Sequence, residues 1–152
     1  MSRTIRECIF VVLCLFSLGV NAAWVTKHGL TSAQYQAEFD KYVAQGYKLT
    51  NVSGYTVGNT VYYAGIWEDT PGPAWVARHG MTSSSYTNLS RYYSKLGFQQ
   101  IYVSAYNQGN TALFAAIWDK SNLRTNAKHD LTAARFMQLN DYYSAREVES
   151  KS

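Results

Sequence analysis

The sequence lacks three features that would each indicate a particular class of protein. Both cysteines, Cys8 and Cys14, lie in the first 22 residues, so the rest of the chain holds neither a disulfide framework nor a thiol nucleophile. Charges are scattered in ones and twos, without a run of five or six like signs, which argues against a nucleic-acid-binding arm or a polybasic membrane patch. Only two prolines are present, so little disorder is expected before the C-terminal tail. Because no disulfide framework is available, an apolar core must hold the protein together.

A hydrophobic run long enough to span a membrane is also missing. The apolar stretch from Cys8 to Val20 is shorter than the roughly 20 residues that a span needs. Arg3 and Arg6 precede this stretch, and small residues follow it just before Ala23, as is typical of a secretory signal peptide. Residues 1–22 are therefore predicted to be a signal peptide, and the mature protein is predicted to be secreted, extracellular and free of the membrane. A retained membrane anchor is the alternative.

What the chain does contain is a repeated motif, W-V-x-[KR]-H-G-[LM]-T, which begins at Trp24 and again at Trp75. Residues 24–69 align with residues 75–120 at a constant offset of 51 without gaps, and 18 of the 46 aligned positions are identical. A third copy, incomplete and less similar, runs from Lys128 to Tyr143. We therefore predict repeat 1 at 23–70, repeat 2 at 71–121, a partial third repeat at 122–145 and a frayed tail at 146–152.

Each complete repeat is predicted to form a strand, a helix and a β-hairpin. In repeat 1 a short strand begins at Trp24 and is expected to end at Gly29. Thr31 and Gln34 form a capping box at the start of a helix, which ends at Gly46. One buried face of this helix is predicted to comprise Tyr35, Phe39, Tyr42 and Val43.

The hairpin follows the helix. Residues 47–55 and 61–67 are rich in aromatic and β-branched residues, and Gly58-Asn59 forms the turn between them. The short linker Pro71-Gly72-Pro73 keeps the repeats together in one compact domain. The fold class is α+β, with antiparallel sheet elements packed against helices. The partial third repeat, with a helix from Ala133 to about Ala145, is predicted to cap the array.

The motif and its surroundings resemble the bacterial tandem repeat domain family. The features that carry the resemblance are W-V-x-R-H-G-[ML]-T, the aromatic helix, G-[YF], S-G-Y and A-x-I-W, and they cover about Trp24 to Tyr143. In that family the repeats often precede a β-lactamase-like serine hydrolase domain, as in fungal polyglycine hydrolases. No S-x-x-K motif occurs in this sequence, so no catalytic residue carries over from the resemblance.

Histidine recurs at the same place in each copy, as His28, His79 and His129. Arg78-His79-Gly80 matches the start of histidine phosphatases, but the independent second histidine that this chemistry requires is absent. Three converging histidines would suit zinc, although the third copy is incomplete. We therefore predict no metal and no cofactor. We expect His28 and His79 to occupy equivalent, mostly buried positions and to bond to backbone or to a neighbouring repeat.

Aromatic side chains are abundant, with 13 tyrosines and four tryptophans. Aromatic faces stack on sugar rings, but repeat-invariant apolar positions more often mark the core between repeats. Most of these rings are therefore expected to be core residues, while Tyr92 is expected to be exposed. The candidate binding residues are Trp67, Trp118, Tyr92, Arg78, His28 and His79.

These observations favour a secreted, non-catalytic binding module for an extracellular macromolecule, either a glycan or a cell-surface protein. The alternatives are a structural extracellular component and a small secreted hydrolase that uses the repeated histidines. The sequence leaves the oligomeric state open. Two N-glycosylation acceptor patterns begin at Asn51 and Asn88. Asn88 is ranked above Asn51, and both matter only in a eukaryotic host.

Overall fold

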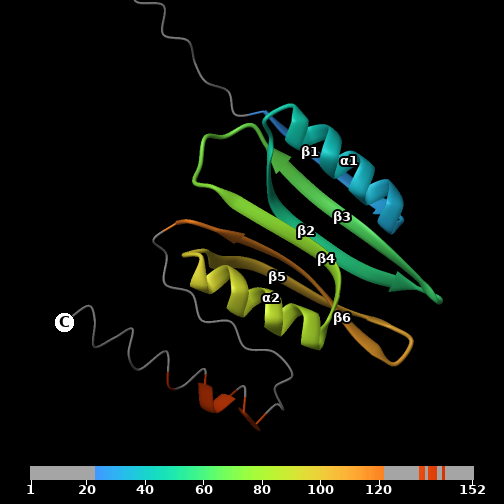
Figure 1. Ribbon diagram of the computed structural model, residues 1–152. Coiled ribbons are helices and arrows are strands. Elements are labelled where there is room, and N and C mark those ends of the chain that lie inside the picture. Colours follow the sequence, from blue (N-terminus) through green and yellow to red (C-terminus); the bar gives the residue numbers. More distant parts are fainter. Residues whose placement is uncertain (1–22, 122–133, 136, 140–141, 143–152) are drawn as a thin grey trace, which may run out of the picture.

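The computed structural model of the protein describes residues 23–121, 134–135, 137–139 and 142. Its two complete repeats have the same order of elements (Figure 1), which confirms the predicted strand–helix–hairpin unit. Repeat 1 comprises β1 (Trp24–Leu30), α1 (Ser32–Ala44), β2 (Lys48–Val57) and β3 (Thr60–Glu68). Repeat 2 comprises β4 (Trp75–Thr82), α2 (Ser83–Lys95), β5 (Gln99–Gln108) and β6 (Thr111–Asp119).

Each repeat builds a three-stranded antiparallel sheet whose last strand lies in the middle. The strand orders are β1-β3-β2 in the first sheet and β4-β6-β5 in the second. The registers correspond, because Trp24 lies opposite Glu68 and Trp75 lies opposite Asp119. The strand predicted to end at Gly29 in fact continues to Leu30. Gly29, with a φ of 68°, lies where the register with β3 shifts, so it forms an irregularity within the strand rather than a stop.

The helices begin and end as their sequence predicts. Thr31 and Gln34 form the complete capping box at the start of α1, and the hydroxyl of Thr82 accepts from the Ser85 backbone N–H at the start of α2. Gly46 follows α1 with a φ of 89°. The buried face is narrower than predicted, since Val43 is 39% exposed.

The two faces of each sheet have different neighbours. We call the face that carries the sheet's own helix the inner face and the opposite face the outer face. On β6, alternate residues belong to different cores. Phe114, Ala116 and Trp118 pack with Tyr86 and Tyr93 of α2. The outward set, Leu113, Ala115 and Ile117, joins the core of repeat 1. The outer face of the second sheet therefore packs on the inner face of the first.

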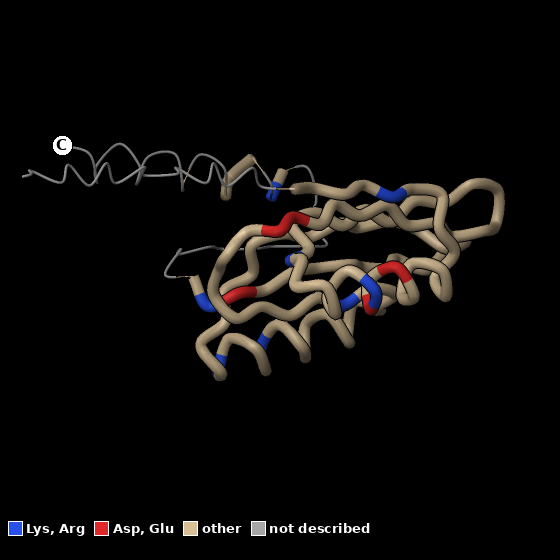
Figure 2. The backbone as a smooth tube through the Cα atoms, turned by 90° about the horizontal axis from the view of Figure 1, so that it is seen from above, with Lys and Arg blue, Asp and Glu red and all other residues tan. Residues whose placement is uncertain are grey.

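Several predictions concern segments outside the described residues: the signal peptide (1–22), the tail (146–152) and most of the partial third repeat. The described positions 134–135, 137–139 and 142, which fall within the predicted third helix, are helical. Acidic and basic residues lie singly or in adjacent pairs along the described chain (Figure 2). None of the described helices has the length and apolar character needed to cross a membrane.

Candidate functional site at the junction of the repeats

His79 on β4 reaches across to repeat 1. Its ring lies 4.8 Å from the ring of Tyr35 and 4.8 Å from that of Tyr63, edge-on to both. Its Nε2 lies 3.0 Å from the hydroxyl oxygen of Ser32, the first residue of α1. Burial among these groups lowers the pKa of His79, so the imidazole is held in its neutral form.

A second polar contact between the repeats lies beside the histidine. The hydroxyls of Tyr63 and Tyr106 are 2.8 Å apart, and Tyr106 also accepts from the backbone N–H of Gly80 at 3.0 Å. Burial raises the pKa of both phenols, most strongly that of Tyr106. These tyrosines therefore act as neutral hydrogen-bonding groups and supply no phenolate base near neutral pH.

A third contact is an ion pair at the edge of the junction. The Lys48 ammonium donates to the Asp119 carboxylate at 3.0 Å, and the two side chains are only 15% and 5% exposed. Burial by itself would raise the pKa of Asp119, but hydrogen bonds from Ser121 and the contact with Lys48 outweigh it and lower that pKa. The pair therefore remains ionised and joins β2 to the end of β6.

An open groove runs along the junction between α1 and β4. One part has a volume of about 350 Å³, and its walls include Tyr35, Gln36 and Phe39 of α1 together with His79. A neighbouring part of about 420 Å³ extends past Phe39 to Val43, Tyr47 and Trp75. The rings of Phe39 and Trp75 meet edge-on at 5.8 Å. The groove thus offers aromatic walls with one side-chain amide at the rim.

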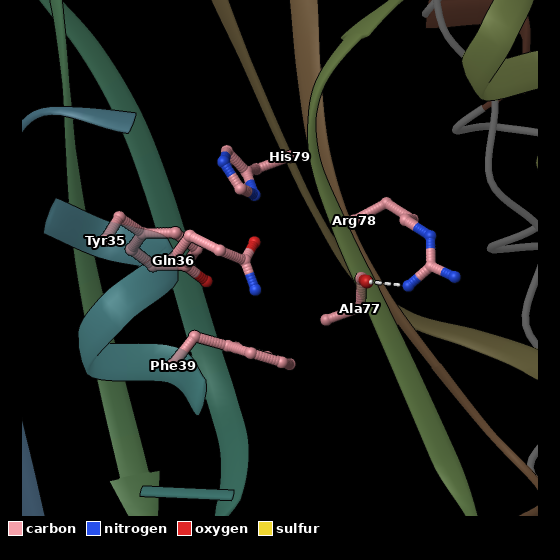
Figure 3. A pocket seen from close by; sticks show the side chains of 6 residues that line it. All are labelled: Tyr35, Gln36, Phe39, Ala77, Arg78 and His79. Atoms are coloured by element: carbon pink, nitrogen blue, oxygen red, sulfur yellow. Dashed lines mark hydrogen bonds between the residues drawn. The ribbon is translucent and has the colours of Figure 1, made fainter. Parts of the chain in front are cut away.

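The predicted site residues divide between this groove and other places. Trp67 and Trp118 are 0% and 1% exposed, so as ligand-stacking candidates they were wrong, and they belong to the two cores. Tyr92 is 56% exposed on α2, away from the groove. Arg78 contributes to the groove wall, but its guanidinium points away from α1 (Figure 3), donates to the Ala77 carbonyl and lies 5.8 Å from the Tyr93 ring.

The two histidines are not equivalent in burial, contrary to the prediction. His79 is half-buried, whereas His28 is exposed, because no described element covers the outer face of the first sheet as repeat 1 covers that of the second. The acceptor asparagines also differ: Asn88 is exposed on α2, and Asn51 is partly buried on β2 opposite Ile66.

Several contributors to the junction were not identified from the sequence, among them Ser32, Phe39 as a groove wall, and the Lys48–Asp119 pair. Ser32 could have been identified from the alignment of the repeats. At the offset of 51 it matches Ser83, just as His28 matches His79. Nothing comparable marks the ion pair, because Lys48 corresponds to Gln99. Among the described residues, no group of three or more His, Cys, Asp or Glu side chains is placed to hold a metal ion.

Two stacked strand–helix–hairpin units define a tandem-repeat domain whose described junction is held by aromatic, hydrogen-bonded and ionic contacts. The chain matches the family model described as "Polyglycine hydrolase-like, structural repeat" twice, at residues 21–70 and 72–121. It therefore belongs to this family of structural repeats.

Proposed function

We propose that the protein is a secreted, non-catalytic binding module that recognises an extracellular macromolecule, a glycan or a cell-surface protein, in the groove between its repeats. The observation that carries the proposal is the composition of the groove. The rings of Phe39, Tyr47 and Trp75 provide stacking surface, and Gln36 provides a rim amide. Apolar walls with a few polar groups are typical of binding sites.

The groove continues from the part beside His79 to the part beside Tyr47, and this length suits a chain-like ligand better than an isolated small molecule. Val43 lies on its wall and is 39% exposed, and Gln36 is exposed as well. Both residues can be substituted without removing a core side chain. They therefore separate loss of binding from loss of folding.

A glycan and peptide array probed with the mature protein tests the proposal. Binding should fall for Gln36→Ala and Val43→Lys, while Gln108→Ala, at an exposed site on β5, should leave it unchanged. Unchanged binding in both groove variants would reject the groove as the site. Absence of binding to any array member would count against a binding module and favour a structural extracellular component.

A hydrolase is the second candidate, and the Ser32–His79 contact is the observation that favours it. A serine hydroxyl 3.0 Å from a neutral imidazole has the spacing of a nucleophile and its base. Within the described part of the chain, however, no carboxylate hydrogen-bonds to His79 to orient its ring. Hydrolysis of p-nitrophenyl acetate that disappears in Ser32→Ala, without a change in melting temperature, would establish the enzyme instead.

Secretion is part of the same proposal, together with capping of the array by the partial third repeat. The charged start and short apolar run of residues 1–22 support export. Intact-mass measurement of the exported protein should give a mature N-terminus near Ala23. In a eukaryotic host, sugar is expected at the exposed Asn88 before Asn51. Recovery of the full-length chain from Met1 in the cytosol would contradict export.

A further inference from the structure

The outer face of the first sheet is built like a surface that repeat 2 buries. At the offset of 51, its side chains correspond one by one to those of the second sheet that pack on repeat 1. Ile66 and Ala64 correspond to Ile117 and Ala115, which are both fully buried. This outer face comprises Trp24, Thr26, His28, Thr50, Asn51, Ser53, Tyr55, Tyr62, Ala64, Ile66 and Glu68.

A hydrogen bond within the first sheet orients Tyr55 of this face in the same way as Tyr106 is oriented on the outer face of the second sheet. Tyr55 accepts from the backbone N–H of Gly29 at 3.0 Å, just as Tyr106 accepts from Gly80 at 3.0 Å in the docked repeat. Tyr106 uses its hydroxyl to reach Tyr63 of the neighbouring repeat as well. The Tyr55 hydroxyl is therefore already positioned for the same contact.

The largest side chain of the face is open to solvent. Trp24 is 65% exposed, whereas its counterpart Trp75 is partly buried against the ring of Phe39. An indole held on a sheet with most of its surface in water is unfavourable unless a partner covers it. In repeat 2, the surface that covers the equivalent Trp75 is the inner face of repeat 1.

We propose that the outer face of the first sheet is a docking surface for the inner face of another repeat of this kind, supplied by a second protein. Docking in the geometry of the repeat 1–repeat 2 junction fixes the chemistry of the partner. It must present a serine at the start of its helix for His28 and a phenol for Tyr55. It must also present an aromatic ring for Trp24 and a lysine for Glu68.

Repeat 1 has this set on its own inner face, but repeat 2 does not. At the positions of Phe39, Lys48 and Tyr63, repeat 2 carries Ser90, Gln99 and Phe114. The second repeat of another copy of this chain therefore does not fit. The first repeat of another copy is not available, because its inner face is already covered by its own repeat 2. The fitting partner is a repeat of the first type from a different protein.

The face also differs from its buried counterpart in a way that suits a reversible contact. Thr26, Thr50, Asn51 and Tyr62 stand where repeat 2 has Ala77, Ile101, Tyr102 and Leu113, so four positions are more polar. Interfaces between proteins that associate and separate are more polar than permanent cores. These substitutions keep the face soluble while it is unoccupied.

The proposal is tested by giving the chain an additional first repeat. A second copy of residues 23–74 is fused to the N-terminus of the mature chain, with a protease site in the added linker. The added inner face should dock, raise the melting temperature and shield Trp24 of the original first repeat from acrylamide quenching. After the linker is cut, the added repeat should still co-elute with the chain.

Matched variants make the outcome decisive. Ile66→Lys in the original first repeat should abolish the gain in the extended protein but leave the melting temperature of the ordinary mature chain nearly unchanged. An added repeat that leaves Trp24 quenchable, or that separates after cleavage, overturns the proposal. Co-sedimentation of the mature chain with cellulose or chitin that is lost in both Trp24→Ala and Tyr62→Ala also overturns it, because the face would then be a glycan platform.

Discussion

Repeat 1 and repeat 2 are the same unit in different surroundings. The inner face of the first sheet is covered by α1 and by repeat 2, whereas its outer face has no described neighbour. The outer face of the second sheet is buried against repeat 1. Equivalent residues therefore differ in their burial and in their contacts, as the exposed His28 and the half-buried His79 show. Position in the array, more than residue type, decides what a side chain contributes.

The largest expected difference involves the ion pair. Lys48→Met removes the charge that faces the buried Asp119, and leaving a buried charge unpaired costs about 3 kcal/mol of unfolding free energy. Urea denaturation should show this loss. Gln99→Met, the matched change in repeat 2, should have a much smaller effect. Equal effects of the two substitutions would mean that the pair does not hold the junction.

The next effect concerns a close approach of the two sheets. A Cβ added at Gly54 would lie 2.2 Å from the Tyr106 ring, so Gly54→Ala must displace that ring and should cost about 1–3 kcal/mol. At the equivalent position in repeat 2, Ala105 is exposed, and Ala105→Val should change the stability by less than about 0.5 kcal/mol. Thermal unfolding of both variants measures the contrast.

Substitution of the two histidines compares the same position in both settings. His79→Ala removes the ring that packs against Tyr35 and Tyr63, and should lower the unfolding free energy by about 1–2 kcal/mol. Ser32 is exposed and can bond to water instead, so its lost contact adds little. His28→Ala should leave the stability within about 0.5 kcal/mol of the parent. A larger loss at His28 would show that the outer face is occupied in solution.

The smallest expected effect is a dependence on pH. Because burial lowers the pKa of His79 below its usual 6.5, the unfolded chain takes up this proton before the folded one does. The stability from the neutral ring is fully present above pH 6.5 and is lost as the pH falls from 6.5 towards the lower folded-state pKa. Melting temperatures at several pH values should show a shallower decline in His79→Ala than in the parent protein.

Much of the unit could be predicted from the sequence, because its signals are local. The capping box at Thr31 and Gln34, the stop at Gly46 and the turn at Gly58-Asn59 depend on backbone requirements that neighbouring residues meet by themselves. The end of β1 could not be predicted in this way. A left-handed glycine ends a strand or forms a bulge within it, and only pairing with β3 decides between these outcomes.

The sequence by itself determined the repeat, its length and its order of elements, since duplication preserves the spacing of caps, turns and alternating strands. Only the tertiary structure decided which face of each sheet is covered. The groove between α1 and β4, the contact of Ser32 with His79 and the pair of Lys48 with Asp119 all depend on residues that are distant in the sequence, and the two contacts join positions at least 47 apart. Such contacts follow from how one repeat is rotated onto the next, and that rotation leaves no periodic trace in the chain.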